Sequence, residues 1–268
     1  MPIRILSLPA KDLQYAIDSM NVRDLMAFSL CSRQPENLVK SSNRQIEEIS
    51  AKVNENRIEF RITAKKFQEL PKHVAPDDDE YFELISFNIS ESWIKLYSEG
   101  KYEEWRKEEF TQADWIPHIL SVFNEPMINT LTIESVRHSY LDNVEQLIPK
   151  CHKLTIMDNC SNHVAKMTLS NLSTIAVENV DIYQDIFSNK NDISKLLSLN
   201  LKAVKINIWK KPLEIKLDDL LPANFRSLYI SNTKITENEL NRFLKLWMKS
   251  NHTYYRPERM SLYRQDER

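Results

Sequence analysis

The sequence predicts an α+β protein in which a small helical segment is followed by a degenerate α/β solenoid. Three observations support this fold class. Apolar residues recur at helical spacing over the first part of the chain, alternate with polar residues from residue 46, and form repeated short triplets from about residue 127. The 268 residues allow about two domains at roughly 150 residues each. We therefore divide the chain into residues 1–45, 46–126 and 127–268.

The first segment, residues 1–45, is expected to form three short helices. Pro9 suits the first turn of a helix, and a second apolar set follows Asn21. Pro35 is expected to break this second set before a third helical piece that contains Leu38 and Val39. A unit of less than ~70 residues rarely builds a sufficient core alone. This segment is therefore expected to bury one apolar face against something else.

The second segment, residues 46–126, is expected to be a mixed connecting layer. Alternating apolar residues on either side of 54–56, Asn-Glu-Asn, predict a β-hairpin, and the alternation over 85–89 predicts a third strand. The acidic run 77–80 is interpreted as a solvated loop rather than a cation site, because it lacks the spacing of a calcium loop. Residues 91–123 are expected to be mainly helical, and they carry Trp93, Trp105 and Trp115.

The third segment, residues 127–268, contains short apolar-x-apolar triplets at intervals of 21 to 32 residues. They begin at Leu131, Leu154, Ile175, Val204, Leu228 and Met260. Leucine-rich repeats of about 20–29 residues have such a strand core. The sequence therefore predicts a leucine-rich-repeat-like stack with one strand per repeat; the alternative is an ordinary α/β layer with unequal connections.

In such a stack, the outer residues of each triplet are buried and the middle residues face the concave side. We expect a buried row formed by Ile133, Ile156, Val177, Ile206 and Ile230. The opposite row is expected to comprise Thr132, Thr155, Ala176, Lys205 and Tyr229. The concave strand face of a solenoid is the usual binding surface.

The composition excludes several classes of enzyme. The chain has a single glycine, Gly100, so it contains no P-loop, no dinucleotide-binding fingerprint, no kinase glycine loop and no G-x-S-x-G elbow. It has 22 asparagines, which also tolerate left-handed backbone and are expected at helix ends and turns. No catalytic constellation stands out, and we expect no cofactor and no enzymatic activity.

Charge and cysteine content favour an intracellular protein, cytoplasmic or nuclear. The net charge is −2, which provides no global attraction to nucleic acid or membrane. Three cysteines, Cys31, Cys151 and Cys160, do not form a disulfide framework, so we expect reduced thiols. Neither a signal peptide nor a transmembrane helix is expected.

The N-terminal residues resemble an F-box, in the form found in nematode proteins. The resemblance is carried by Leu8-Pro9, by the helical apolar residues that follow, by Asp24-Leu25, and by Ser29-Leu-Cys-Ser-Arg33. The chain departs from the family after Arg33, where many F-boxes have a tryptophan and this chain has Gln34-Pro35-Glu36.

The later stretches 115–123, 148–162 and 240–249 resemble the F-box-associated domain, of type two, that follows such F-boxes. Together these likenesses imply a substrate-recognition subunit of a Skp–cullin–F-box ubiquitin ligase. The F-box would bind the Skp-type adaptor and, through it, the cullin. The second domain would bind a protein target. The alternative is a leucine-rich-repeat-like protein-binding scaffold without ligase output.

The resemblance implies residues that bind the adaptor, and the expected solenoid suggests residues that bind the target. In the F-box pattern, the residues that meet the adaptor or hold the helices that do so are Leu8, Pro9, Ile17, Met20, Leu25, Phe28, Leu30, Leu38 and Val39. For the target, the concave strand face suggests Lys205 and Tyr229, with Trp209 near the end of its strand and Tyr254 and Tyr255 extending the surface. An equally good interpretation of Trp209 is that it covers the sheet edge.

Two other kinds of site are less well supported. Cys151, His152, Cys160 and His163 have zinc-ligand chemistry, but the first two are adjacent on an expected strand and so point to opposite faces. Repeat-core cysteines are the favoured interpretation, and no metal is expected. The C-terminal stretch 242–268 interleaves basic residues with aromatic ones, a combination found both in single-strand nucleic-acid binders and in protein hot spots. We favour protein binding.

Overall fold

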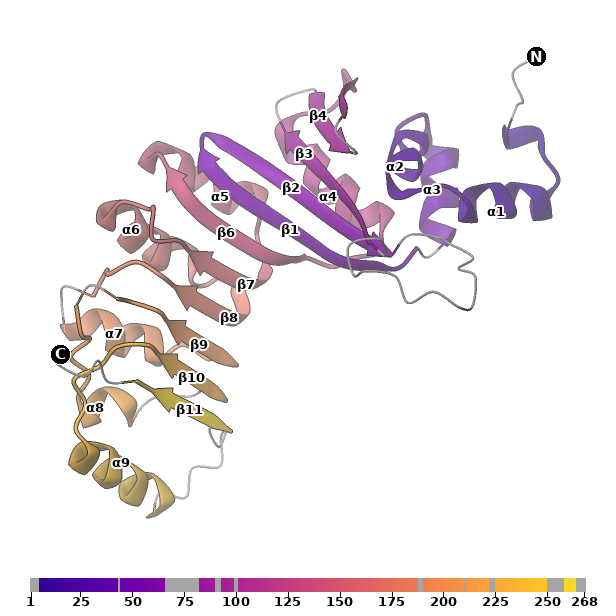
Figure 1. Ribbon diagram of the computed structural model, residues 1–268. Helices are drawn as coiled ribbons and strands as arrows, with labels where there is room; N and C mark the ends of the chain where they lie inside the picture. Colours follow the sequence, from indigo (N-terminus) through magenta and orange to yellow (C-terminus); the bar gives the residue numbers. More distant parts are fainter. Residues whose placement is uncertain are drawn as a thin grey trace. The chain divides into compact units, whose positions relative to one another are not determined.

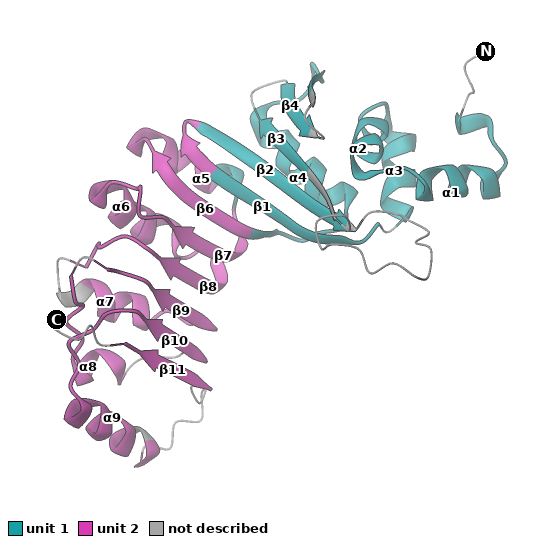
Figure 2. Ribbon diagram, in the orientation of Figure 1, with its two compact units in different colours: residues 1–52, 57–129, 146–148 teal, residues 53–56, 130–145, 149–268 magenta. Residues whose placement is uncertain are grey.

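The computed structural model describes residues 5–42, 44–65, 82–89, 93–98, 101–187, 190–209, 211–221, 225–249 and 258–263. These residues form a mixed α/β structure with a large sheet (Figure 1). The chain separates into two compact units (Figure 2). The first comprises residues 1–52, 57–129 and 146–148, and the second comprises residues 53–56, 130–145 and 149–268. The division into residues 1–45, 46–126 and 127–268 stays a prediction.

The first unit begins with a short 3-10 turn and three helices: η1 (Ile5–Ser7), α1 (Ala10–Asp18), α2 (Val22–Ser29) and α3 (Arg33–Ser42). Helix α2 starts where the sequence predicts, because the Asn21 side chain accepts a hydrogen bond from the Asp24 backbone N–H at 2.7 Å. The expected break at Pro35 is wrong. Pro35 lies in the first turn of α3. Backbone N–H groups in the first turn have no carbonyl acceptor within the helix, so a proline there costs no helical hydrogen bond.

The strands of this unit follow the order β1-β2-β3-β4-β5. They are β1 (Ile46–Glu55), β2 (Arg57–Lys65), β3 (Phe82–Ile89), β4 (Trp93–Ser98) and β5 (Lys101–Arg106). The hairpin is confirmed, because β1 and β2 are neighbours in the sheet on either side of Asn56. The third strand is confirmed by the antiparallel pairing of β2 with β3, as in Phe60↔Phe87 and Ile62↔Ile85. The acidic run 77–80 lies outside the described residues.

The expected helices over 91–106 are wrong. Trp93 and Trp105 lie on the antiparallel strands β4 and β5, whereas Trp115 is on helix α4 (Gln112–Val122). The physical reason is visible in β4, where the buried Ile94 and Leu96 alternate with exposed side chains. A period of two specifies a strand even where tryptophans are abundant.

Helix α4 ends with asparagine in the role expected for glycine. Asn124 has a φ of 56°, its N–H bonds the Ser121 carbonyl, and the Glu125 N–H bonds the Leu120 carbonyl. These two bonds form a Schellman motif, which places a left-handed residue just after the helix. Asparagine therefore replaces glycine at this position, as the composition predicts.

The second unit alternates strands with helices. Its strands are β6 (Ile128–Val136), β7 (Cys151–Ile156), β8 (Ala176–Ile182), β9 (Ala203–Ile206), β10 (Ser227–Ile230) and β11 (Arg259–Leu262). Between them lie η3 (His138–Tyr140), α5 (Leu141–Leu147), α6 (Asn162–Leu172), α7 (Lys190–Leu197), α8 (Leu217–Leu220) and α9 (Glu237–Lys249). The strands follow chain order, and β7 to β11 pair in parallel. None of the helices in the described part of the chain combines the length and hydropathy of a membrane-spanning segment.

The third repeat triplet is misplaced in the sequence prediction. Leu154 pairs with Val180 and Ile156 with Ile182, so the β8 triplet is Val180-Asp-Ile182 and not Ile175-Ala-Val177. Val180 and Ile182 are fully buried, whereas Val177 is 38% exposed. The expected row is otherwise buried at Ile133, Ile156, Ile206 and Ile230. With the corrected start at residue 180, the triplets begin 23, 26, 24, 24 and 32 residues apart, which is a more regular spacing over the first five strands.

Candidate functional site

One face of the strands β7 to β11 carries polar and aromatic side chains in register. Because side chains alternate along a strand, burial of Val180 and Ile182 places Asn179 and Asp181 on the opposite face. The first row across this face consists of Lys153, Asn179, Ala203, Ser227 and Arg259. The second row consists of Thr155, Asp181, Lys205, Tyr229 and Ser261. We call this surface the strand face.

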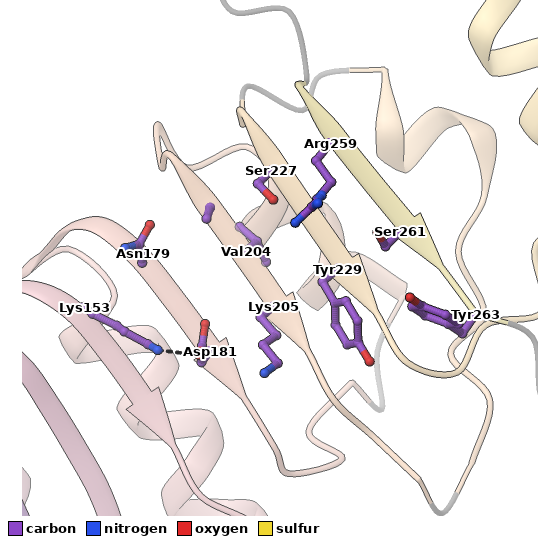
Figure 3. Close-up of a pocket in the computed structure, with 11 residues that line it drawn as sticks. Lys153, Asn179, Asp181, Val204, Lys205, Ser227, Tyr229, Arg259, Ser261 and Tyr263 are labelled. Atoms are coloured by element: carbon purple, nitrogen blue, oxygen red, sulfur yellow. Dashed lines mark ion pairs between the residues drawn. The ribbon is translucent and has the colours of Figure 1, made fainter. Parts of the chain in front are cut away.

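The strand face forms a shallow groove of about 640 Å³ (Figure 3). Its lining includes Lys153, Asp181, Lys205, Tyr229, Arg259 and Tyr263. In Figure 3 the side chains of Lys205, Tyr229 and Tyr263 lie side by side on neighbouring strands. The groove is therefore built by the parallel register and not by a loop.

Lys205 lies at the centre of this groove between two tyrosines. Its Nζ is 5.4 Å from the centre of the Tyr183 ring and 5.5 Å from that of Tyr229. Both distances are within the range of cation–π attraction. A side-chain hydrogen bond with Tyr183 raises the pKa of Lys205, against a smaller opposing effect of desolvation. Lys205 therefore carries its positive charge at neutral pH.

The groove lining contains more cationic side chains than carboxylates. Lys153 Nζ pairs with the Asp181 carboxylate at 2.7 Å, which neutralises both groups, and Asp181 is buried. Within the described residues, no carboxylate forms an ion pair with Lys205 or Arg259. The groove lining holds three cations and one carboxylate, and is therefore positive within a chain of net charge −2.

The aromatic side chains continue the groove toward β11. The rings of Tyr229 and Tyr263 lie 5.4 Å apart and are tilted by 50°. Tyr229 is half-buried, and Tyr263 is 54% exposed. Such amphipathic rings offer contact area at low entropic cost, together with hydroxyl groups that can donate or accept hydrogen bonds.

The structure brings together only some of the residues predicted to bind the target. Lys205 and Tyr229 are neighbours on β9 and β10 and line the groove. Trp209 follows β9, is 68% exposed and does not line the groove, so it neither joins this site nor covers a sheet edge tightly. Tyr254 and Tyr255 lie outside the described residues.

Sequence reasoning missed several residues that line the groove or lie beside it. Asp181 and Tyr183 were missed because the β8 triplet was placed five residues early, and the apolar pair Val180 and Ile182 could have corrected it. Arg259 and Tyr263 flank the triplet that begins at Met260. Their alternation with the apolar Met260 and Leu262 indicates that they lie on the strand face and could have identified them.

The residues predicted to bind an adaptor fall into two groups. Ile17, Leu25 and Val39 are fully buried in the first unit and hold its helices. The others are half-buried or, for Pro9, exposed, and so keep apolar surface available: Leu8, Pro9, Met20, Phe28, Leu30 and Leu38. The first group is structural, and only the second group can contribute directly to an interface.

A buried polar pair connects α2 to α4 in the first unit. Ser29 Oγ lies 3.0 Å from His118 Nε2 and donates its own proton to the Met26 carbonyl at 2.7 Å. His118 Nε2 is therefore the donor to Ser29, so this ring nitrogen carries a proton. Burial lowers the pKa of His118 from 6.5 to about 4, and Lys107 and Lys40 add to this effect while Glu36 opposes it.

The cysteines and histidines weighed as zinc ligands do not converge. Cys160 Sγ donates to the Glu134 carbonyl at 2.7 Å, His163 stacks on His138, and His152 faces Glu178. Burial raises the pKa of Cys151 to about 12 and that of Cys160 to about 11, so both thiols stay protonated at neutral pH. Over the described ranges, no group of three or more His, Cys, Asp or Glu side chains is arranged to hold a metal ion.

A protein-family model described as F-box associated matches residues 192–254. This stretch contains β9, β10 and α9, and therefore the strands that carry Lys205 and Tyr229. No curated protein and no solved structure was found to match the chain. The matched stretch thus includes two of the five strands of the strand face.

Proposed function

We propose that this chain is a non-catalytic substrate-recognition subunit of a Skp–cullin–F-box ubiquitin ligase. In this proposal residues 1–45 form the F-box that docks a Skp-type adaptor, and the strand units of the second unit form a solenoid that holds the protein target. Such a complex operates inside the cell. The observation that carries the proposal is the F-box associated match over residues 192–254, which contains β9 and β10, two of the five strands that line the groove.

The N-terminal helices support the adaptor half of the proposal. Their cores use Ile17, Leu25 and Val39, yet half-buried apolar side chains such as Phe28 and Leu38 remain at the surface. Apolar surface that a small helical unit does not cover itself is typical of a docking module. Leu8 and Pro9 precede α1 and belong to the same set.

The strand face supports the target half. Tyrosine and arginine are enriched among the side chains that dominate protein–protein binding energies. The groove presents Tyr229 and Arg259 on strands, with Tyr263 directly after β11, so these side chains are pre-organised for binding.

The test is a reciprocal pair of variants. Fully burying one leucine side chain contributes ~1.5–3 kcal/mol, so Leu8→Ala with Pro9→Ala is expected to weaken binding to a purified Skp-type adaptor by at least roughly tenfold. Isothermal titration calorimetry measures this affinity, and circular dichroism checks that the variant is folded. The matched control, Tyr229→Ala in the strand face, should leave adaptor affinity unchanged.

Unchanged adaptor affinity in the folded Leu8/Pro9 variant would refute the docking assignment. A second assay separates the ligase from a simple scaffold. The chain, assembled with adaptor and cullin, should promote ubiquitin transfer to a target retained by the wild-type chain and released by Tyr229→Ala. Adaptor binding without any such transfer would favour the scaffold.

A further inference from the structure

The strand face contains two cations that the described residues leave without a carboxylate partner. Lys205 is held between two tyrosine rings, and Arg259 extends from β11 toward β10 (Figure 3). Lys153, by contrast, is already paired with Asp181. The positive charge that can act on a ligand is therefore located at two defined positions.

We propose that this groove binds an extended acidic segment of the target protein, with one carboxylate on Lys205 and a second on Arg259. The inference rests on the proposed function and specifies the chemistry of its target. The ammonium of Lys205 has three N–H donors, so its contact with Tyr183 leaves donors for a ligand carboxylate. Arg259 offers a planar guanidinium that can bind a carboxylate through two parallel hydrogen bonds.

The register sets the spacing of the two acidic positions. Arg259 is two strands away from Lys205 and two residues back along the strand direction. With strands about 4.8 Å apart and about 3.3 Å per residue, the two Cα atoms are separated by roughly 12 Å. An extended peptide covers that distance in three to four residues. Because side chains alternate along an extended peptide, two that face the groove are an even number of residues apart, so we expect acidic side chains at positions i and i+4.

The tyrosines explain why a peptide fits better than a nucleic acid. Tyr229 and Tyr263 contact each other at a tilt of 50°, so their faces are not arranged as parallel platforms for successive bases. A single-strand binder also needs a continuous cationic path along the phosphates. Here the Asp181 carboxylate interrupts that path beside Lys205.

Tyr183 has a positioning role in this arrangement. It follows β8, and its backbone N–H bonds the Ile156 carbonyl at 2.8 Å, which fixes it beside Lys205. Because Lys205 occupies the space between the Tyr183 and Tyr229 rings, a ligand cation is not expected there. The pair of rings instead orients the lysine toward an anion.

The experiment selects short random peptides, displayed on phage, on the purified 268-residue chain. Recovered peptides should be enriched in Asp or Glu at the i and i+4 spacing. The best synthetic peptide is then measured by fluorescence polarisation. Lys205→Glu should lower its affinity by at least roughly tenfold, and replacing the peptide's acidic residues with their amides should do the same.

Two further variants keep the result interpretable. Lys205→Met retains a long side chain between the tyrosines but removes the charge, and should also weaken binding if the variant remains folded. Lys195→Glu makes the same charge reversal on an exposed position of α7, away from the strand face, and should change the affinity by less than roughly twofold.

Several outcomes would overturn the proposal. These are selection of peptides without acidic enrichment, failure to select any peptide, or affinities that the Lys205 variants leave unchanged. Phosphoserine in place of glutamate tests the other source of anionic charge, and a gain of more than roughly tenfold would assign the site to phosphate instead of carboxylate. Tighter binding of a short single-stranded oligonucleotide than of the peptide would assign the face to nucleic acid.

The adaptor assay separates this inference from the proposed function. Lys205→Glu should leave adaptor affinity intact. Failure of the peptide selection with normal adaptor binding would reject only the acidic target. Loss of adaptor binding with normal peptide selection would reject only the ligase role.

Discussion

Different kinds of contact stabilise the interior of each compact unit. In the second unit, equivalent residues of successive strands meet in register, as in the row Leu154, Val180, Val204, Leu228 and Met260. In the first unit, the helices are joined to the rest by individual polar contacts that occur once each. Ser29 meets His118, Arg23 meets Glu103, and the Asn124 side chain bonds the Lys40 carbonyl at 2.9 Å.

This difference determines what each unit can present to a partner. Because equivalent residues of successive strands lie side by side, they form a continuous face. A groove can therefore extend across several strands. Unique side-chain contacts fix one arrangement of a few helices and depend on each member being present. Substitutions should therefore have effects of different size and different pH dependence in the two units.

The largest expected loss in the free energy of unfolding is at a buried strand residue of the second unit. Ile182 is fully buried between its register partners Ile156 and Ile206. Ile182→Ala removes buried methyl groups and leaves a cavity, which should lower the free energy of unfolding by about 2–5 kcal/mol. Urea unfolding followed by far-UV circular dichroism measures this loss.

Val177→Ala is the matched control for the corrected register. Val177 is 38% exposed and lies on the same strand, so its truncation should cost less than about 1 kcal/mol. Equal losses for the two variants, or a larger loss at Val177, would contradict the assignment of Val180 and Ile182 to the core.

The next effect is a pH dependence specific to the first unit. The pKa of folded His118 is lowered to about 4 by burial, from 6.5. Between these values the unfolded chain binds a proton that the folded chain does not. The free energy of unfolding therefore decreases as pH falls from about 6.5 to about 4, by on the order of 3 kcal/mol, and this contribution is constant below pH 4.

His118→Gln should remove this slope, because glutamine does not titrate yet can still donate to Ser29. Urea midpoints from tryptophan fluorescence suit the measurement, since the fully buried Trp115 lies on the same helix. An unchanged slope between pH 6.5 and 4 in His118→Gln would show that other groups cause it.

Prediction from the sequence succeeded where the apolar residues of a segment follow a single period, either helical or alternating. The N-terminal helices, the hairpin at 54–56, the strand at 85–89 and most of the triplets followed from spacing. It failed at residues 93–106, where the abundance of tryptophans outweighed the alternation of Ile94 and Leu96. It also failed at Pro35, which a first helical turn accommodates.

The candidate site was only partly predictable for a related reason. Lys205 and Tyr229 followed directly from correct triplets. Predicting Asp181 and Tyr183 required the exact register of β8. The pair Ile175 and Val177 has the same apolar spacing as the pair Val180 and Ile182, so the sequence offers two possible registers. Only pairing with a neighbouring strand distinguishes the two alternatives, because a shift in register changes which side chains share a face. The His118 and Ser29 contact joins residues 89 positions apart and has no local signal.

A smaller effect compares the helix caps of the two units. The Asn21 side chain accepts from the Asp24 N–H at 2.7 Å, and the Ser161 hydroxyl of the second unit accepts from the Val164 N–H at 3.3 Å. Asn21→Ala should cost about 1 kcal/mol, and Ser161→Ala should cost less because its bond is longer. Urea unfolding of both variants under the same conditions tests this order, and a larger loss at Ser161 would contradict it.

The smallest effect concerns an ion pair of the first unit. Arg23 on α2 bonds Glu103 on β5, and each side chain is about one third exposed. Water and salt screen such a pair, and half-exposed pairs contribute about 0.2–1 kcal/mol. A double-mutant cycle with Arg23→Gln and Glu103→Gln should therefore give a coupling energy in that range that decreases at high salt. The pair of Lys234 and Glu214 in the second unit is more exposed, at 54% and 59%, so the equivalent cycle should give a smaller coupling. A coupling in the second unit equal to that in the first would contradict the conclusion that single polar contacts matter more where no repeated register supports the fold.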